Sequence, residues 1–272
     1  MTTHDRDWLQ RHVQPSGLER IEAFFGGHAY SPHRHDTYAI GRTLAGVQRF
    51  QYRRDRCNSL PGVTMVLHPD ELHDGEAGTE DGFRYRMLYV EPARLQEALG
   101  GKALPFIQGG LSTDPRLLRA TQALLQGLDR PLDPLEEQDA LFDLAQALSA
   151  SAGQTPGRQS FDFRAAQTAR EYLHDALQRP VTLEELAVAS GRDRFALSRD
   201  FRALFGTSPY RYLTLRRLDL VRRLILCGVS LTDAAADAGF CDQSHMTRHF
   251  TQAYGLSPAR WLRALNRAPV QA

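Results

Sequence analysis

The sequence has few cysteines, no strong excess of either charge and no long apolar run. Its cysteines, Cys57, Cys227 and Cys241, are isolated and odd in number, a pattern that argues against a disulfide framework and against a paired-cysteine metal site. No apolar stretch approaches membrane-spanning length, so no membrane partner is expected. The first eleven residues lack the apolar core of a secretory signal. We therefore expect a cytoplasmic protein with reduced thiols.

The charge is distributed unevenly along the chain. The formal net charge is +1 over 272 residues. Residues 161–272 carry 16 basic and 11 acidic side chains, whereas residues 1–160 carry 17 and 21. A moderate basic excess is compatible with phosphate binding, but it is far weaker than a polybasic patch. Charge alone therefore does not identify a partner.

The first part of the chain has the pattern of a small β domain followed by helices. Short strand-like segments alternate with Gly, Pro, Asn and Asp, which predicts an antiparallel barrel or sandwich over about 15–95. From Asp114 the apolar residues recur at helical spacing, which predicts two amphipathic helices over about 114–150. The strand-like segments are 38–40, 47–52, 64–67 and 85–90.

A change of composition divides the chain in two. Residues 151–160 are small, polar and rich in turn formers, as in a flexible linker. Everything after them is helical in pattern. We therefore expect an α+β protein of two domains, with a β-barrel and two helices over 1–150 and an all-α domain over 161–272. The helices expected in the second domain are 164–177, 183–189, 194–205, 210–226, 231–238, 244–254 and a short turn near Trp261.

The second domain contains an internal duplication, in which residues 182–209 align with 230–258. Thr182 and Ser230 stand where a hydroxyl would cap a helix. Each unit then reaches Gly191 or Gly239, where the chain can turn sharply. These features predict helix-turn-helix units at 182–206 and 230–255. A constant offset of 49 relates Arg199 to Arg248, Phe201 to Phe250, Phe205 to Tyr254, Gly206 to Gly255, Ser208 to Ser257 and Pro209 to Pro258.

The outer face of the second helix in each unit carries side chains that can read DNA. Arg can bridge guanine O6 and N7, Gln can bridge adenine N6 and N7, and Ser, Thr and His supply single hydrogen bonds. The alternative is a solvated face, but such a face more often mixes Glu and Lys at helical spacing. For Phe195 the sequence leaves two interpretations, a core position or a contact with a thymine methyl group. The candidate DNA-binding residues are Arg194, Phe195, Ser198, Arg199, Arg202, Gln243, Ser244, His245, Thr247 and Arg248.

On these motifs, residues 182–261 resemble the DNA-binding domain of AraC/XylS-type transcription regulators. The resemblance implies that a long helix, here 210–226, separates two recognition helices that enter successive major grooves of double-stranded DNA, about 34 Å apart. It also implies contact with RNA polymerase and a homodimer. In the family the helices of 114–150 would form the dimer contact; packing of these helices onto the barrel is the alternative, and the pattern does not decide between them.

The first domain resembles the cupin-like sensor domain of the same family, through His33-Arg34-His35 and the segment PDELH at 69–73. Gly27 followed five residues later by this histidine pair matches half of the metal-binding cupin motif. The acidic ligand expected next is replaced by Tyr38, Ala39 and Ile40, and the second half-motif is one residue short. We therefore expect no cofactor, with a metal ion on His33, His35 and His73 as the alternative.

A small barrel of this kind can enclose one small molecule. For any single polar residue near its mouth, an ordinary hydrogen bond in a loop is an equally good interpretation. The chemical class of such an effector is not encoded in any motif. The candidate effector-binding residues are His33, His35, Tyr38, His68, Glu71 and His73, with Arg84, Tyr85 and Tyr89 as further members.

These features predict a sequence-specific DNA-binding transcription regulator that responds to a small molecule, an activator by family habit and not an enzyme. An effector can act only if it binds two arrangements of the domains with different affinity. The alternative function is a metal-dependent cupin enzyme with an accessory helical domain. A regulator without any effector is the third hypothesis.

Overall fold

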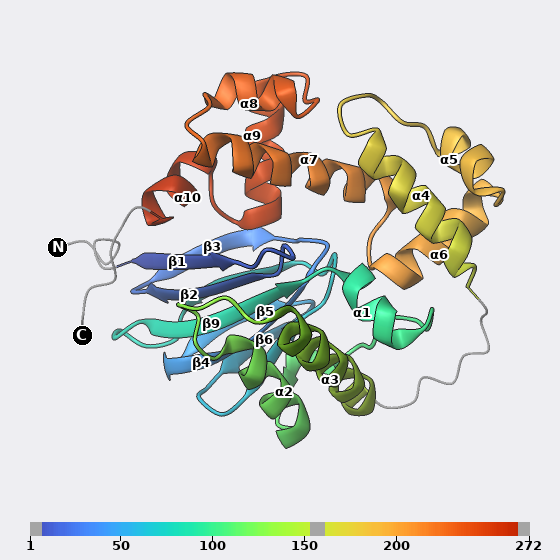
Figure 1. The fold of residues 1–272 in the computed structure, drawn as a ribbon. Coiled ribbons are helices and arrows are strands. Elements are labelled where there is room, and N and C mark those ends of the chain that lie inside the picture. The colour runs from blue at the N-terminus through green and yellow to red at the C-terminus, as the bar shows by residue number, and fades with distance from the viewer. Residues whose placement is uncertain (1–6, 153–160, 266–272) are drawn as a thin grey trace.

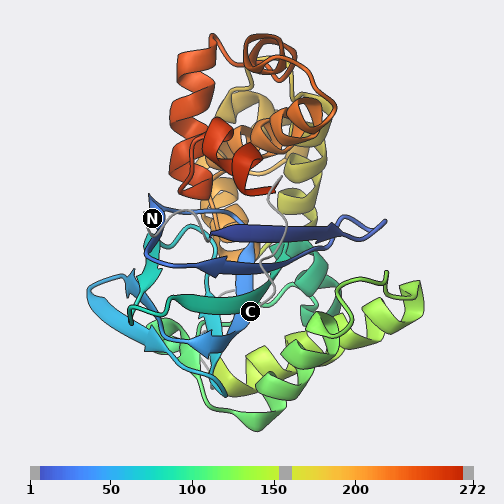
Figure 2. The same cartoon turned by 90° about the vertical axis from the view of Figure 1, so that its left-hand side faces the viewer.

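The computed structural model describes residues 7–152 and 161–265. A β-rich N-terminal part and a helical C-terminal part stack on one another, as Figures 1 and 2 show. This arrangement confirms the predicted α+β fold of two domains. The predicted linker, 151–160, falls almost entirely on 153–160, which lies outside the described residues.

The N-terminal part consists of two antiparallel sheets that pack face to face. The strands predicted from the sequence are present, but β1, β2, β3, β6, β8 and β10 were not predicted as separate strands. β3 contains Pro32, and β8 has the polar sequence HDGEA, so neither shows clean apolar alternation. The larger sheet has the order β1 (Trp8–Val13), β2 (Glu19–Phe25), β9 (Phe83–Val90), β4 (Tyr38–Gly46), β7 (Thr64–Leu67) and β10 (Leu111–Ser112), and the smaller sheet has the order β3 (His28–His33), β8 (His73–Ala77), β5 (Gln48–Tyr52) and β6 (Asp55–Ser59).

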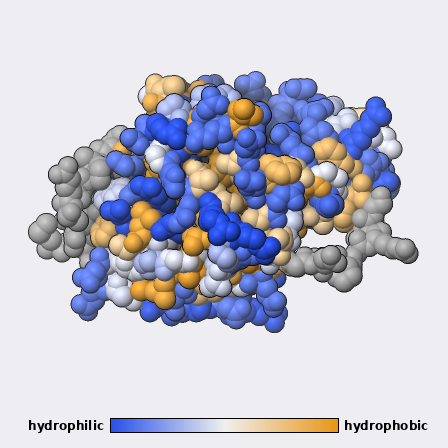
Figure 3. Space-filling view, turned by 60° about the horizontal axis from the view of Figure 1, so that its bottom comes forward, coloured by the Kyte–Doolittle hydropathy of each residue, from blue (hydrophilic) through white to orange (hydrophobic). Residues whose placement is uncertain are grey.

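Helices cover the outer face of the larger sheet. α2 (Pro115–Leu125) and α3 (Pro134–Ala152) bury Leu117, Leu124 and Leu144 in one cluster with sheet residues such as Val66 and Leu88. The apolar stripes of these helices thus pack onto the barrel, the second of the two alternatives. Figure 3 shows this side of the molecule with orange and blue atoms interspersed. The preceding elements are α1 (Pro92–Leu99), which was not predicted from the sequence, and a 3₁₀ turn, η2 (Gln108–Gly110).

The C-terminal part contains both predicted helix-turn-helix units. Thr182 caps its helix in a reciprocal arrangement with Glu185, and Ser230 accepts a hydrogen bond from the N–H of Asp233; both predicted caps are confirmed. None of the helices in the described ranges is long and apolar enough to cross a bilayer. The helices are α4 (Phe163–Asp175), α5 (Leu183–Ser190), α6 (Arg194–Phe205), α7 (Pro209–Leu226), α8 (Leu231–Asp237), α9 (Gln243–Tyr254) and α10 (Pro258–Leu265).

The long helix α7 joins the two units through its own side chains. Tyr212 and Leu213 belong to the core of the first unit, whereas Leu218, Val221 and Ile225 belong to the core of the second. One rigid helix therefore carries both units, as Figure 1 shows.

Both units are docked directly on the N-terminal domain. The second helix of each unit ends in a glycine with left-handed backbone, Gly206 (φ 76°) and Gly255 (φ 67°). A Cβ at Gly206 would lie 2.3 Å from Cβ of Pro69, and one at Gly255 would lie 2.8 Å from Nδ1 of His33. The absence of a side chain at these two positions therefore allows the close approach of the domains.

Candidate functional site

The first recognition helix, α6, is positioned by a capped N-terminus and a buried inner face. The Asp193 carboxylate accepts hydrogen bonds from the N–H groups of Phe195 and Ala196. Leu197 and Phe201 are fully buried against the rest of the unit. Because the helix repeats every 3.6 residues, burial of this stripe leaves the opposite side chains facing away from the core.

The outward side chains of α6 form a basic surface. Phe195 is 70% exposed, so it lies outside the core; the guanidinium of Arg194 stacks on its ring at 4.9 Å. Arg202 donates a hydrogen bond to the Ser198 hydroxyl at 2.9 Å. Arg199 is exposed and lies 3.2 Å from a carboxylate oxygen of the next residue. The five candidates of this helix therefore share one accessible face.

The second recognition helix, α9, is built in the same way. The Asp242 carboxylate caps it by accepting from the N–H of His245, and Met246 and Phe250 are buried. Gln243, Ser244 and Arg248 are exposed, whereas Thr247 and His245 are half-buried. A ring nitrogen of His245 lies 2.9 Å from one of His249, so this imidazole packs along its own helix more than the other four candidates do.

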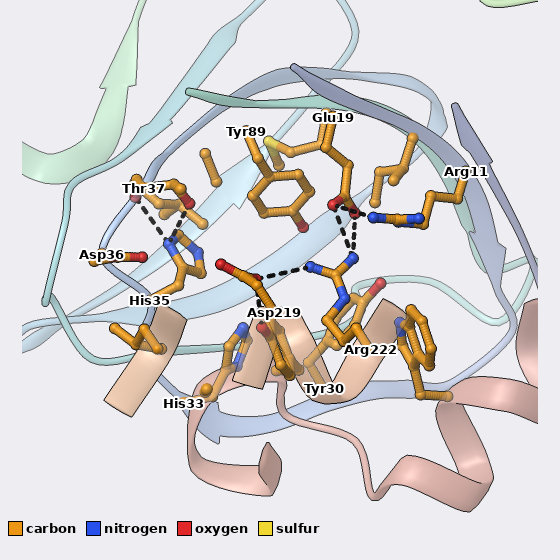
Figure 4. A pocket seen from close by; sticks show the side chains of 18 of the residues that line it. Arg11, Glu19, Tyr30, His33, His35, Asp36, Thr37, Tyr89, Asp219 and Arg222 are labelled. Carbon is orange, nitrogen blue, oxygen red and sulfur yellow. Dashed lines mark hydrogen bonds and ion pairs between the residues drawn. The ribbon is translucent and has the colours of Figure 1, made fainter. Parts of the chain in front are cut away.

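A cavity of about 370 Å³ lies between the barrel and the helical domain. Strands of both sheets form its floor, and side chains of α7, α9 and α10, including Tyr254 and Trp261, close it from above. Figure 4 shows barrel residues and α7 residues pointing into one space. A ligand in this cavity would therefore touch both domains at once.

Three histidines line one wall of the cavity. His33 is the cross-strand partner of His73 in the β3–β8 pair, and His35 follows shortly after the end of β3. A ring nitrogen from each lies within 4.8 Å of the others. Burial lowers the pKa of all three, to about 3 for His35 and about 4 for His73, so the imidazoles are neutral at physiological pH.

Ion pairs that cross the domain boundary also line the cavity. Arg222 of α7 donates to both carboxylate oxygens of Glu19 at 2.7 and 2.8 Å, and Arg11 also pairs with Glu19 at 3.0 Å. Burial would raise the pKa of Glu19, but the two guanidinium groups outweigh it and lower the pKa to about 2. Arg216 similarly contacts Asp36 at 2.9 Å. These pairs, visible in part in Figure 4, hold α7 over the barrel mouth.

The structure brings together only part of the predicted effector set. His33, His35 and His73 line the cavity, as do Tyr85 and Tyr89. The other four, Tyr38, His68, Glu71 and Arg84, lie outside the cavity lining. Tyr38 donates to the Pro105 carbonyl in the core under α2; His68 bonds Tyr52 and the N–H of Ile107; Glu71 pairs with Arg53 and Arg84 with Glu22 at the surface.

The charged part of the cavity was not predicted from the sequence. Glu19 and Arg222 are 203 residues apart in the chain, and no motif relates them. Their contact arises only when the helical domain docks on the barrel. Tyr30, whose hydroxyl lies 2.7 Å from that of Tyr85, was likewise hidden in a strand that the sequence did not predict. The unpredicted lining residues include Arg11, Glu19, Tyr30, Arg216 and Arg222.

Two protein families match successive parts of the chain. Residues 15–145 match the family described as AraC-like ligand binding domain, and residues 186–264 match a helix-turn-helix domain. The two matches follow the order and approximate extent of the β-rich part and of the duplicated helical units. They favour a regulator over the cupin enzyme.

Similar proteins with both parts are known. The chain is 26% identical over 221 residues to the HTH-type transcriptional regulator YbfI of Bacillus subtilis, covering 79% of this chain and 80% of that protein. It is 24% identical over 245 residues to the HTH-type transcriptional activator RhaS of Escherichia coli, covering 84% and 86%.

The arrangement of the two domains also has a solved counterpart. The structure of ToxT from Vibrio cholerae superposes with a TM-score of 0.64 and 11% identity, covering 96% of this chain and 98% of ToxT; this likeness concerns the fold. The ligand-binding and helix-turn-helix matches, the full-length relatives and the duplicated recognition helices agree. The chain belongs to the AraC-type family of DNA-binding transcription regulators.

Proposed function

We propose that the protein is a cytoplasmic transcription activator. It binds a small-molecule effector in the interdomain cavity, and effector binding changes its affinity for promoter DNA. The observation that carries this proposal is the composition of the cavity wall, which includes strands of the ligand-binding domain and helices of the DNA-binding domain. A ligand that contacts both domains has different affinities for different domain arrangements, which is the physical requirement for coupling.

DNA binding and activation are supported by separate observations. The ten candidate residues on α6 and α9 supply the DNA contacts, with Arg248 and Gln243 as the main base readers. Activation is supported by the relative RhaS, which is named as a transcriptional activator. RNA polymerase is then the expected protein partner. The regulator has no catalytic step in this proposal, because an effector need only be bound and released.

A second copy of the chain is a further proposed partner. The buried stripes of α2 and α3 are already used against the barrel, but Leu135 (65% exposed) and Phe142 (52% exposed) on α3 remain at the surface. These two side chains are where we expect a homodimer contact, and light scattering of the Phe142→Ser variant beside the unaltered protein would test it.

The main experiment maps genomic fragments bound by the purified full-length protein near physiological salt, where nonspecific phosphate attraction is suppressed. We expect enrichment of a motif with two half-sites about one helical turn apart, because α7 carries two recognition helices on one rigid rod. A variant with both Arg248→Ala and Arg199→Ala is the matched control and should lose the enrichment. Binding without any shared motif would overturn the proposal.

A further inference from the structure

The three cavity histidines have a hydrogen-bond arrangement that fixes their tautomers. Nδ1 of His33 lies 2.9 Å from the Ser31 carbonyl oxygen, Nδ1 of His35 lies 2.8 Å from that of Thr37, and Nδ1 of His73 lies 2.9 Å from that of Glu71. A carbonyl oxygen can only accept, so each Nδ1 carries the proton and donates it. Each Nε2 therefore presents a lone pair.

Nothing in the described parts of the protein donates a hydrogen bond to any of these three Nε2 atoms. The side chains are 7, 6 and 3% exposed, and all three residues line the cavity, so three acceptors gather in one of its walls. Ring packing alone, with the His33 and His73 centroids 4.3 Å apart, would leave these lone pairs without a partner. One cation would satisfy all three at once.

The pattern matches what metal-bound imidazoles require. In metal sites, each histidine usually donates its other ring nitrogen to a carbonyl or carboxylate, which fixes the ring orientation. Here all three histidines meet that condition through backbone carbonyls, which no side-chain rotation can remove.

We propose that His33, His35 and His73 bind one divalent transition-metal ion of the zinc class through Nε2, and that its open coordination position takes an anionic oxygen donor of the effector. Imidazole nitrogen suits zinc, copper, nickel and iron. A tetrahedral ion held by three protein ligands keeps one position free. The described histidine cluster contains no carboxylate, and the nearby carboxylates of Asp36 and Glu19 are already paired with Arg216 and Arg222, so the open position favours an anionic ligand. This proposal takes up the alternative that the sequence left open, a metal ion on these three histidines.

The site is adjacent to the second recognition helix. Ser31 donates its N–H to the Gly255 carbonyl at 3.2 Å, and Arg34 donates its N–H to the Gln252 carbonyl at 2.9 Å. Gly255 is the residue that ends α9. Closure of three imidazoles around an ion, to the about 3.4 Å spacing of nitrogens in a tetrahedral site, therefore pulls on the strand that holds α9. This regulatory part rests on the proposed function; the metal site itself does not.

The test is a Co²⁺ titration of full-length protein previously stripped with a chelator. We expect one equivalent to bind and to give the intense visible absorption of four-coordinate cobalt. His73→Ala and His35→Ala should each lower the affinity at least 100-fold. His28→Ala, on the same strand but exposed, and His249→Ala, in the α9 pair, are the matched controls and should bind as the unaltered protein does.

Added acetate tests the open position, because an anion that coordinates shifts the cobalt bands. The metal site would be overturned if no cobalt bound, or if the His73→Ala variant gave the same cobalt spectrum as the unaltered protein. The proposed coordination of the effector would be overturned if acetate did not shift the cobalt bands. His73→Gln, close to isosteric, replaces His73→Ala if the latter fails to fold by circular dichroism. Because the titration contains no DNA, a negative result leaves the DNA-binding function standing, and that function is tested separately by the genomic fragments.

Discussion

The two helix-turn-helix units are copies in sequence, but they are attached to the barrel in different ways. The end of α6 is held by backbone and amide contacts: the Leu104 N–H donates to the Ala203 carbonyl, and Gln96 donates to the Leu204 carbonyl. The end of α9 rests on β3 beside the histidines. Within the described residues, α9 lines the cavity and neither α5 nor α6 does. Both units are therefore anchored through backbone hydrogen bonds, but only the second adjoins the ligand cavity within the described residues.

The largest expected effect is the loss of stability when Gly206, at the end of α6, is replaced by alanine, compared with the same change at Gly191. Gly206→Ala should lower the free energy of unfolding by about 3 to 4 kcal/mol, because left-handed strain adds to the collision with Pro69. Gly191→Ala has the same kind of backbone (φ 66°) but no atom within 4 Å of the new Cβ, so it should cost only about 1 kcal/mol. Urea unfolding of both variants measures the difference. Equal costs would mean that the domains do not dock at Gly206.

The next effect concerns the ion pair beside the second unit. Glu19 has a folded pKa of about 2 against an ordinary value of 4.5, so its contribution is complete above about pH 4.5 and is lost as the pH falls through 2. Glu19→Gln should lower the free energy of unfolding by about 3 kcal/mol at most at pH 7, and the gap to the unaltered protein should narrow between pH 5 and pH 2. Urea unfolding at several pH values checks this sign.

Asp70→Asn is the control at the first unit. Asp70 pairs with Arg211 at 2.6 Å but its side chain is 29% exposed, against 15% for Glu19. Asn tolerates the positive φ of 62° at this position. We expect a cost below about 1 kcal/mol. A larger loss here than at Glu19 would reverse the comparison between the two attachments.

The next prediction concerns DNA affinity, which should depend on arginines of the recognition helices and not on exposed arginines elsewhere. Arg248→Ala should weaken specific DNA binding by about 1 to 3 kcal/mol and relax base preference at its position in the site. Arg119→Ala, an exposed arginine on α2, removes the same charge far from α9 and should leave the preference unchanged. Gel-shift titrations on matched and mismatched sites measure both. Unchanged binding by Arg248→Ala would remove this residue from the interface.

The smallest effect is expected for the isolated DNA-binding domain. Residues 161–272 contain both helical cores, so the fragment should fold and bind the same site within about 1 kcal/mol of the full chain. In this fragment Gly206→Ala should cost no more than Gly191→Ala, since Pro69 is absent. Circular dichroism and gel shifts decide the matter; an unfolded fragment would place the boundary elsewhere.

The helical part was the more predictable because its signals are local. N-caps such as Thr182, apolar spacing and turn glycines act within a few residues of each other, so helix bounds and outward faces follow from the sequence. In the barrel, β8 carries a polar sequence and pairs with strands distant in the chain. Histidines at 33, 35 and 73 were singled out together with Tyr38, His68 and Glu71, because composition does not tell which face of a strand a residue occupies.

By itself, the sequence determined the two classes of domain, the duplicated units and the side chains available to DNA, because each depends on short-range periodicity and capping. Only the tertiary structure decided that the helical domain closes the barrel, that Arg222 meets Glu19 across the boundary, and that three histidines gather on one wall of the cavity. Those contacts depend on burial and on strand pairing between residues far apart in the chain, and no local pattern encodes them.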